Sequence, residues 1–345
     1  MHSVALPKLS PGDRVAVVSP SFAAPSVAPA VHDLGMLRLR EELGLEPVEY
    51  PTTRRQGSPA ERAADLHAAF ADPSVRAVLA TIGGSDQITV LRYLNPDVVR
   101  ADPKPFFGFS DNTNLLNWLW FHGVASYHGG STIMHLGRGH STHPVSIRSL
   151  RAALFDSGDV EVTPVDEFAE DEYGWSDPRR LSDLPPMLPS EGFFWHQPDR
   201  IVTGPTWGGN LEILGWTLAV SKYVHPVERY AGCVLLLETS EEMPPADEVY
   251  WTLRNAGERG LLEQFPAVLV GRPKASFVLN PKSPEERRRY RTDQRAAVLR
   301  AFADYNPDAM IVFDVDFGHT DPQWVLPYGG RLTVDGPGRR IVAHY

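Results

Sequence analysis

The sequence predicts an α/β protein whose N-terminal half is built on a largely parallel sheet. Short apolar runs that are typical of buried strands, such as Arg14–Ser19 and Pro105–Phe109, alternate with segments of helical periodicity, such as Ala30–Leu43. This alternation is typical of βαβ units. The chain has 345 residues, of which 42% are hydrophobic and 22% charged. It is therefore long enough for two domains of ~150 residues each.

The elements of the N-terminal half follow from the apolar period and from helix-start signals. One helix is expected after Ser58, a typical N-cap residue that precedes Pro59 at the first helical position. The expected strands cover residues 14–19, 46–50, 75–84 and 105–109, and the expected helices cover 30–43, 58–72, 86–94 and 112–121. Each strand is thus followed by a helix that can return the chain for a parallel neighbour.

The middle of the chain, Thr163–Arg200, is rich in acidic, proline and aromatic residues and has no sustained period. A long segment of this kind is usually functional or a linker. We therefore predict an N-terminal domain over 1–165, a linker or substrate loop over 166–200 and a C-terminal domain over 201–345. In the last part, strands are expected over 232–238, 265–271 and 309–318, helices over 246–259 and 283–305, and a hairpin around Asp335-Gly336.

Composition excludes several classes of protein. The net charge is −10 and no basic stripe with interleaved aromatic residues occurs, so nucleic-acid binding is not expected. The single cysteine, Cys233, excludes a disulfide within the chain and a cysteine-rich metal site. The N-terminus lacks the basic head and long apolar middle of a signal peptide. No apolar stretch approaches the ~18 residues of a membrane span, and the protein is interpreted as cytoplasmic.

Ser110 lies where an apolar strand meets a helix without a spacer. A hydroxyl at such a sharp turn, beside the free N–H groups of a helix N-terminus, suits attack on a carbonyl group and stabilisation of an oxyanion. This is the arrangement of a nucleophile elbow, although Asn112 stands where the usual G-x-S-x-G pattern has its second glycine. From this stretch alone, Ser110 or Asp111 also fits the role of a helix N-cap.

A nucleophilic serine needs a base and an orienting acid. His319 follows a strand and a glycine in a loop, and Glu238 ends the apolar run CVLLLE. A buried carboxylate needs a partner, and pairing with His319 would fix the imidazole tautomer. Other acidic residues compete for this role, namely Glu241, Glu242, Asp314 and Asp316. The pair Gly83-Gly84 is a candidate oxyanion-hole segment, because glycine allows close backbone approach.

Five histidines gather between positions 122 and 143, namely His122, His128, His135, His140 and His143. Their spacing admits a metal site. However, no acidic residue lies among them and the segment is rich in glycine and serine. We therefore favour surface or pocket histidines and expect no bound metal.

Six motifs, in order along almost the whole chain, resemble the LD-carboxypeptidase family of serine peptidases. They are SPS (Ser19–Ser21), TIGG (Thr81–Gly84), GFSDNT (Gly108–Thr113), WGGNL (Trp207–Leu211), LLLE (Leu235–Glu238) and GHTDPQWVLPYG (Gly318–Gly329). The last motif is the most specific, and its occurrence together with Gly-x-Ser-Asp strengthens the resemblance.

This resemblance implies a catalytic triad of Ser110 as nucleophile, Glu238 as acid and His319 as base. It also implies an oxyanion hole made by the backbone N–H groups of Gly84 and Asp111. The implied fold has an α/β N-terminal domain like class I glutamine amidotransferases and a C-terminal domain built around a smaller β-structure, with the site between them. No metal or organic cofactor is implied, and a homodimer is expected because members often form one.

The family includes murein tetrapeptide carboxypeptidases and a branch similar to microcin C immunity peptidases, which cleave aminoacyl or peptidyl nucleotides. This chain has Ile82–Asp86 where the murein enzymes usually carry Arg-Gly-Gly-Tyr-Gly, so we favour an aminoacyl- or peptidyl-nucleotide substrate. Murein tetrapeptides and a non-catalytic binding role remain alternatives. Candidate substrate contacts are Trp175, Trp195, Trp207 and Asn210, although most tryptophans serve packing.

Overall fold

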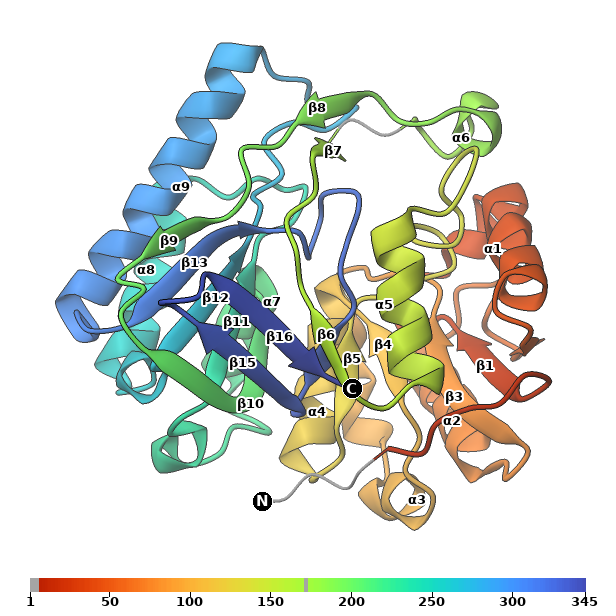
Figure 1. The fold of residues 1–345 in the computed structure, drawn as a ribbon. Coiled ribbons are helices and arrows are strands. Elements are labelled where there is room, and N and C mark those ends of the chain that lie inside the picture. The colour runs from red at the N-terminus through yellow and green to blue at the C-terminus, as the bar shows by residue number, and fades with distance from the viewer. Residues whose placement is uncertain (1–5, 171–172) are drawn as a thin grey trace.

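The computed structural model describes residues 6–170 and 173–345. In this part of the chain most strands form two large sheets that lie side by side (Figure 1). The first sheet has six strands in the order β14-β5-β4-β3-β1-β2. Its strands are β1 (Arg14–Val18), β2 (Glu46–Glu49), β3 (Val75–Ala80), β4 (Phe106–Gly108), β5 (Ser126–His128) and β14 (Leu326–Tyr328). Strands β1 to β5 pair in parallel, so the predicted parallel sheet is confirmed.

The first four helices of this half connect successive parallel strands, as the sequence predicts, and the fifth leads from β5 to the second sheet. They are α1 (Pro29–Glu41), α2 (Pro59–Ala71), α3 (Pro96–Ala101), α4 (Thr113–Phe121) and α5 (Pro144–Phe155). Helix α2 begins with a capping box in which Ser58 and Glu61 each accept a hydrogen bond from the backbone N–H of the other. The start of this helix was therefore readable from local sequence.

The prediction of an α-helix over 86–94 is wrong. The segment forms two short 3₁₀ turns, Gln87–Thr89 and Leu91–Tyr93. Long-range bonds of Gln87 account for this difference. Its Nε2 donates to Asn112 Oδ1 at 2.7 Å, and its Oε1 accepts the N–H of Leu115 at 2.9 Å. The segment thereby caps helix α4 instead of forming a helix of its own.

The second sheet has eight strands in the order β6-β16-β15-β10-β11-β12-β13-β9. They are β6 (Asp159–Glu161), β9 (Phe194–His196), β10 (Ile201–Asn210), β11 (Val234–Glu238), β12 (Ala267–Gly271), β13 (Met310–Val315), β15 (Arg331–Asp335) and β16 (Arg340–His344). Strands β10 to β13 are parallel, and antiparallel strands flank them on both sides. The helices of this part are α7 (Leu211–Val220), α8 (Ala246–Glu258) and α9 (Pro284–Tyr305).

Each sheet includes one strand from the other half of the chain. Strand β14, from the C-terminal part, pairs with β5 of the first sheet, whereas β6 pairs with β16 of the second. The middle segment is not structureless, since it contains β7 (Glu167–Ala169), α6 (Arg179–Ser182), β8 (Met187–Pro189) and β9. Neither sheet is therefore built from one continuous stretch, and the chain passes between them three times, after β5, after β13 and after β14.

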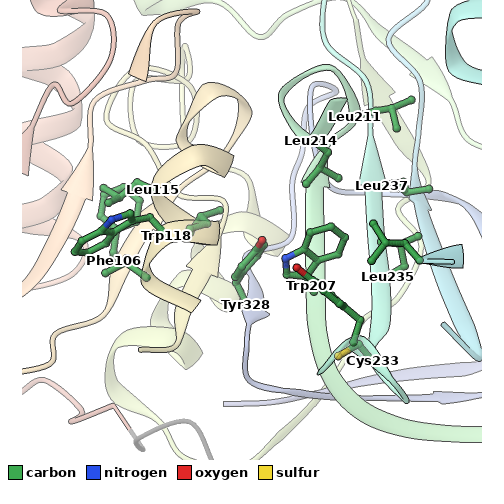
Figure 2. Close-up of a cluster of buried hydrophobic side chains, with 14 of the residues drawn as sticks. Phe106, Leu115, Trp118, Trp207, Leu211, Leu214, Cys233, Leu235, Leu237 and Tyr328 are labelled. Carbon is green, nitrogen blue, oxygen red and sulfur yellow. The ribbon is translucent and has the colours of Figure 1, made fainter. Parts of the chain in front are cut away.

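One hydrophobic cluster joins the two sheets (Figure 2). Leu115 and Trp118 of α4 belong to it together with Trp207 of β10 and Leu235 of β11. Figure 2 shows Tyr328 between the side chains of α4 and those of β10, and its hydroxyl donates to the carbonyl of Gly208 at 3.1 Å. This shared core holds the sheets in one relative position.

Trp207 also makes a polar contact within this core. Its Nε1 donates a hydrogen bond to Asn117 Oδ1 of α4 at 2.9 Å, and the indole stacks on Phe265 with an interplanar angle of 2°. Trp207 therefore contributes to the packing between the sheets.

Among the described residues, no helix has the length and apolar character that crossing a membrane requires.

Trp207→Phe should destabilise the protein by about 1–3 kcal/mol, because the side chain of Asn117 loses its buried donor. Urea unfolding followed by far-UV circular dichroism measures this change. Trp251→Phe is the matched control, since Trp251 is 49% exposed, and surface substitutions usually change stability by less than about 0.5 kcal/mol. Equal unfolding midpoints for the two variants would contradict a structural role for Trp207.

Candidate active site

Ser110 is held in a strained backbone conformation directly after strand β4. The strand ends at Gly108, a 3₁₀ turn covers Ser110–Asn112, and helix α4 begins at Thr113. The φ angle of Ser110 is 60°, in the left-handed region that non-glycine residues avoid. The N-cap of α4 is Asn112, so neither Ser110 nor Asp111 has the alternative role of its N-cap. The geometry is that of a nucleophile elbow.

Glycines allow the neighbouring backbone to approach this serine. A Cβ atom added at Gly83 would lie 2.9 Å from Ser110 Oγ, and one at Gly108 would lie 2.8 Å from Asn112 Cβ. Asn112 takes the place of the second elbow glycine, and its Nδ2 donates to the carbonyls of Phe109 and Ile82 at 3.0 and 3.1 Å. The asparagine side chain thereby ties the elbow to the segment that carries Gly83.

The backbone around Gly84 and Asp111 is fixed by hydrogen bonds of the Asp111 carboxylate. Its Oδ2 accepts from the hydroxyl of Ser21 and, at 2.9 Å, from the N–H of Gln87. Burial raises the pKa of Asp111, and these hydrogen bonds counteract that shift. Gly84 has a φ of 154°, and a Cβ there would lie 2.2 Å from Ser21 Oγ. Only glycine fits at position 84, because a larger residue would collide with Ser21.

Glu238 and His319 form a buried hydrogen-bonded pair. Glu238 is the last residue of β11, His319 follows β13, and His319 Nδ1 lies 2.5 Å from Glu238 Oε2. Burial alone would raise the pKa of Glu238, but the imidazoles of His319 and His128 outweigh it and hold this pKa well below its usual range. For His319, burial works to lower the pKa, whereas the Glu238 carboxylate raises it above its ordinary value.

The competing acidic residues are occupied elsewhere or lie farther out. Asp314 pairs with Arg295 at 2.5 Å, and Asp316 pairs with Arg272 at 2.9 Å. Glu241 approaches the other ring nitrogen, with its Oε2 3.4 Å from His319 Nε2, and its side chain is 42% exposed. Among these acidic residues, Glu238 is thus the one that is hydrogen-bonded to Nδ1 of the ring.

The structure brings Ser110 and His319 to the wall of one cavity of about 640 Å³, which Gly84 and Trp175 also line. Ser110 and Gly84 in addition border a second cavity of about 840 Å³. The serine therefore lies at the junction of two cavities, and only the smaller one is lined by His319.

The four proposed substrate contacts separate into two groups. Trp175 lines the smaller cavity and stacks on Phe22 at 6.1 Å, whereas Asn210 lines the larger one. Trp207 lies in the core between the sheets, and Trp195 lies on β9 at an edge of the second sheet, where Arg339 covers its ring. Neither borders the two cavities, so we withdraw Trp195 and Trp207 as substrate contacts.

His128 is a member of this site that the sequence did not distinguish from the neighbouring histidines. It ends β5, pairs in register with Gly108 of β4, and its Nε2 lies 3.8 Å from Glu238 Oε1. Glu238 therefore lies between two buried imidazoles. The available signal was the position of His128 at the end of a short strand. Of the other four histidines, His135 packs with His128 against the ring of Phe109. The described residues contain no group of three or more metal-ligating side chains.

Two known domain families match this chain. The family model of the LD-carboxypeptidase N-terminal domain matches residues 15–129, and that of the C-terminal domain matches residues 203–334. The chain belongs to the LD-carboxypeptidase family and is a serine hydrolase of the carboxypeptidase type.

Two relatives and one solved structure show the range of this family. The chain is 27% identical to a putative carboxypeptidase, VC_A0337, of Vibrio cholerae over 95% of this chain and 93% of the relative. It is 23% identical to the microcin C7 self-immunity protein MccF of Escherichia coli, over 83% and 79% of the two chains. An MccF-like protein of Streptococcus pneumoniae, solved in complex with AMP, superposes with a TM-score of 0.83 at 25% identity, over 97% of this chain and 99% of that chain.

Glu238→Gln should lower the pKa of His319 from about 9 toward the ordinary value of an imidazole, because an amide no longer stabilises the imidazolium. NMR titration of labelled histidine, with the His319 signals assigned from a His319→Ala sample, measures this pKa. Asp314→Asn is the control, since Asp314 pairs with Arg295 and not with His319. A pKa of His319 that is equal in the wild type and in Glu238→Gln would rule out the pairing.

Proposed function

We propose that this protein hydrolyses the amide-type bond of an aminoacyl or peptidyl nucleotide with a Ser110–Glu238–His319 triad. The observation that carries the proposal is the shared cavity, in which the strained Ser110 and the Glu238-bound His319 lie with two stacked aromatic rings. Ser110 and His319 supply the groups of a serine hydrolase mechanism, and the two aromatic rings supply a binding surface for a flat group.

The mechanism follows from the position of each group. His319 Nε2 accepts the proton of Ser110 as Oγ attacks the scissile carbonyl, while Glu238 holds Nδ1 and stabilises the imidazolium. The N–H groups of Gly84 and Asp111 stabilise the tetrahedral oxyanion, an effect worth about 3 kcal/mol per donor. His319 then passes the proton to the leaving nitrogen, and a water molecule activated by the same ring hydrolyses the acyl-enzyme.

The smaller cavity supports a nucleotide as the leaving group. Phe22 and Trp175 stack with an interplanar angle of 15° on its wall, and Val27 and Phe277 add apolar surface. Purine bases bind to such aromatic surfaces by stacking. The similar S. pneumoniae protein binds AMP and the relative from E. coli is a microcin C7 self-immunity protein, which further supports self-immunity or detoxification as the role of this protein.

Ser110→Ala and His319→Ala should each lower kcat by about 10⁴- to 10⁶-fold, because the members of a triad act as a unit. The assay follows release of the sulfamoyl adenosine from an aminoacyl sulfamoyl adenosine. Ser157→Ala, at an exposed position, is the control and should keep wild-type activity. A serine-directed fluorophosphonate probe should label the wild type and Ser157→Ala but not Ser110→Ala. Near-normal turnover in either triad variant would remove the triad from consideration.

Trp175→Ala should raise KM for an aminoacyl sulfamoyl adenosine by about 5- to 150-fold, since stacking on one base is worth about 1–3 kcal/mol. Trp251→Ala, at an exposed tryptophan of α8, should leave KM unchanged. Assaying a murein tetrapeptide in parallel distinguishes the two branches of the family. Faster release of D-alanine from the tetrapeptide than of nucleotide from the conjugate would assign the protein to cell-wall recycling instead.

A further inference from the structure

The two cavities at Ser110 are chemically different, and this difference assigns them to the two halves of a substrate. The triad histidine protonates the leaving group, so the leaving group lies on the side that His319 borders. That side is the smaller, aromatic cavity. The larger cavity borders Ser110 without His319, so it receives the acyl half. This assignment rests on the proposed function.

The acyl cavity carries an excess of negative charge. Four glutamates line it, namely Glu212, Glu241, Glu242 and Glu248, against one basic residue, Arg259. The guanidinium of Arg259 donates to the carbonyl of Leu218 and to the hydroxyl of Ser221, both at 3.3 Å. Within residues 6–170 and 173–345, no lysine or arginine forms an ion pair with any of these four carboxylates. Glu241 also lines the smaller cavity and faces His319 Nε2 at 3.4 Å, and burial raises the pKa of Glu212. Glu242 and Glu248 therefore carry most of the negative charge that the described residues do not compensate.

Two polar atoms at the start of α7 lack partners in this cavity. Asn210 is 1% exposed and its Oδ1 accepts the N–H of Ile213, but its Nδ2 has no hydrogen-bond partner. Glu212 accepts from the N–H and hydroxyl of Ser240 with Oε1, while Oε2 has none. Buried polar atoms without partners are costly. Asn210 Nδ2 can therefore donate to an oxygen atom of a ligand, and Glu212 Oε2 can accept from a positively charged group of the same ligand.

An aminoacyl group matches these requirements. Its carbonyl oxygen can accept from the amide of Asn210, and an ammonium or guanidinium group can bind the glutamates. The cavity volume of about 840 Å³ is ample for a long side chain in addition to the α-amino group. An acidic side chain would meet like charges and be rejected.

We propose that the acyl cavity selects a cationic aminoacyl group, such as lysyl or arginyl, and that Glu212, Glu241, Glu242 and Glu248 determine this specificity. The substrate class is therefore a basic aminoacyl or peptidyl group joined to a nucleotide-like leaving group. Acyl groups with acidic side chains are the disfavoured class.

The test compares lysyl, norleucyl and glutamyl sulfamoyl adenosine, which share one leaving group. The lysyl compound should have a kcat/KM about 10- to 100-fold above that of the norleucyl compound, the size of effect expected for a hydrogen bond to a charged group. The glutamyl compound should be slowest. In the double variant Glu242→Lys and Glu248→Lys, both at exposed positions, the ratio of lysyl to norleucyl kcat/KM should fall to one or below. Glu263→Lys, exposed and outside the cavity, should keep the wild-type ratio.

Failure of this inference is separable from failure of the proposed function. If the norleucyl or glutamyl compound is cleaved as fast as the lysyl compound, the specificity proposal is overturned and the nucleotide-releasing activity stands. If none of the three is cleaved, the proposed function is overturned, and protection of Ser110 from the fluorophosphonate probe decides the specificity. Lysinamide should then protect at lower concentration than norleucinamide, and equal protection would overturn the inference.

Discussion

The fixed position of one sheet against the other is the constraint on which the site depends. Ser110 follows a strand of the first sheet, whereas Glu238 ends one strand of the second and His319 follows another. These groups meet only because α4, which starts directly after the serine turn, is packed on β10 and β11 through one continuous hydrophobic core. The Trp207–Asn117 hydrogen bond, together with β14 passing from the second half of the chain into the first sheet, adds directional links to this packing.

The buried Glu238 carboxylate is tolerated because two imidazoles approach it. A buried charge without partners carries a large desolvation cost, and at 2% exposure Glu238 would meet that cost. His319 offsets it through the short hydrogen bond and His128 through proximity at 3.8 Å. The same arrangement sets the properties of the proposed base, since a charged Glu238 stabilises protonated His319. Activity that needs the neutral ring therefore rises with pH through the raised pKa of His319.

Local sequence signals predicted those features of the structure that depend on interactions between residues close together in the chain. The strand and helix alternation, the capping-box start of α2 and the serine turn all depend on residues close in sequence. The roles of Gln87 and Trp207 depend on partners that lie far away along the chain, Asn112 in one case and Asn117 in the other. His128 was missed for the same reason, because only the fold places it beside Glu238. The exchange of β14 and β6 between sheets likewise has no local signature.

The acidic acyl cavity and the histidine influence each other. Burial works to lower the pKa of His319, but Glu238 first and then Glu241 and Glu212 raise it above its ordinary value, which favours the protonated ring. A protonated ring cannot accept the serine proton. A cationic acyl group bound against Glu241 and Glu212 would cancel part of their field and return the ring toward its neutral form. The positive charge of the substrate would then contribute to the chemical step as well as to recognition. Its binding would increase the fraction of His319 that is neutral and able to accept a proton.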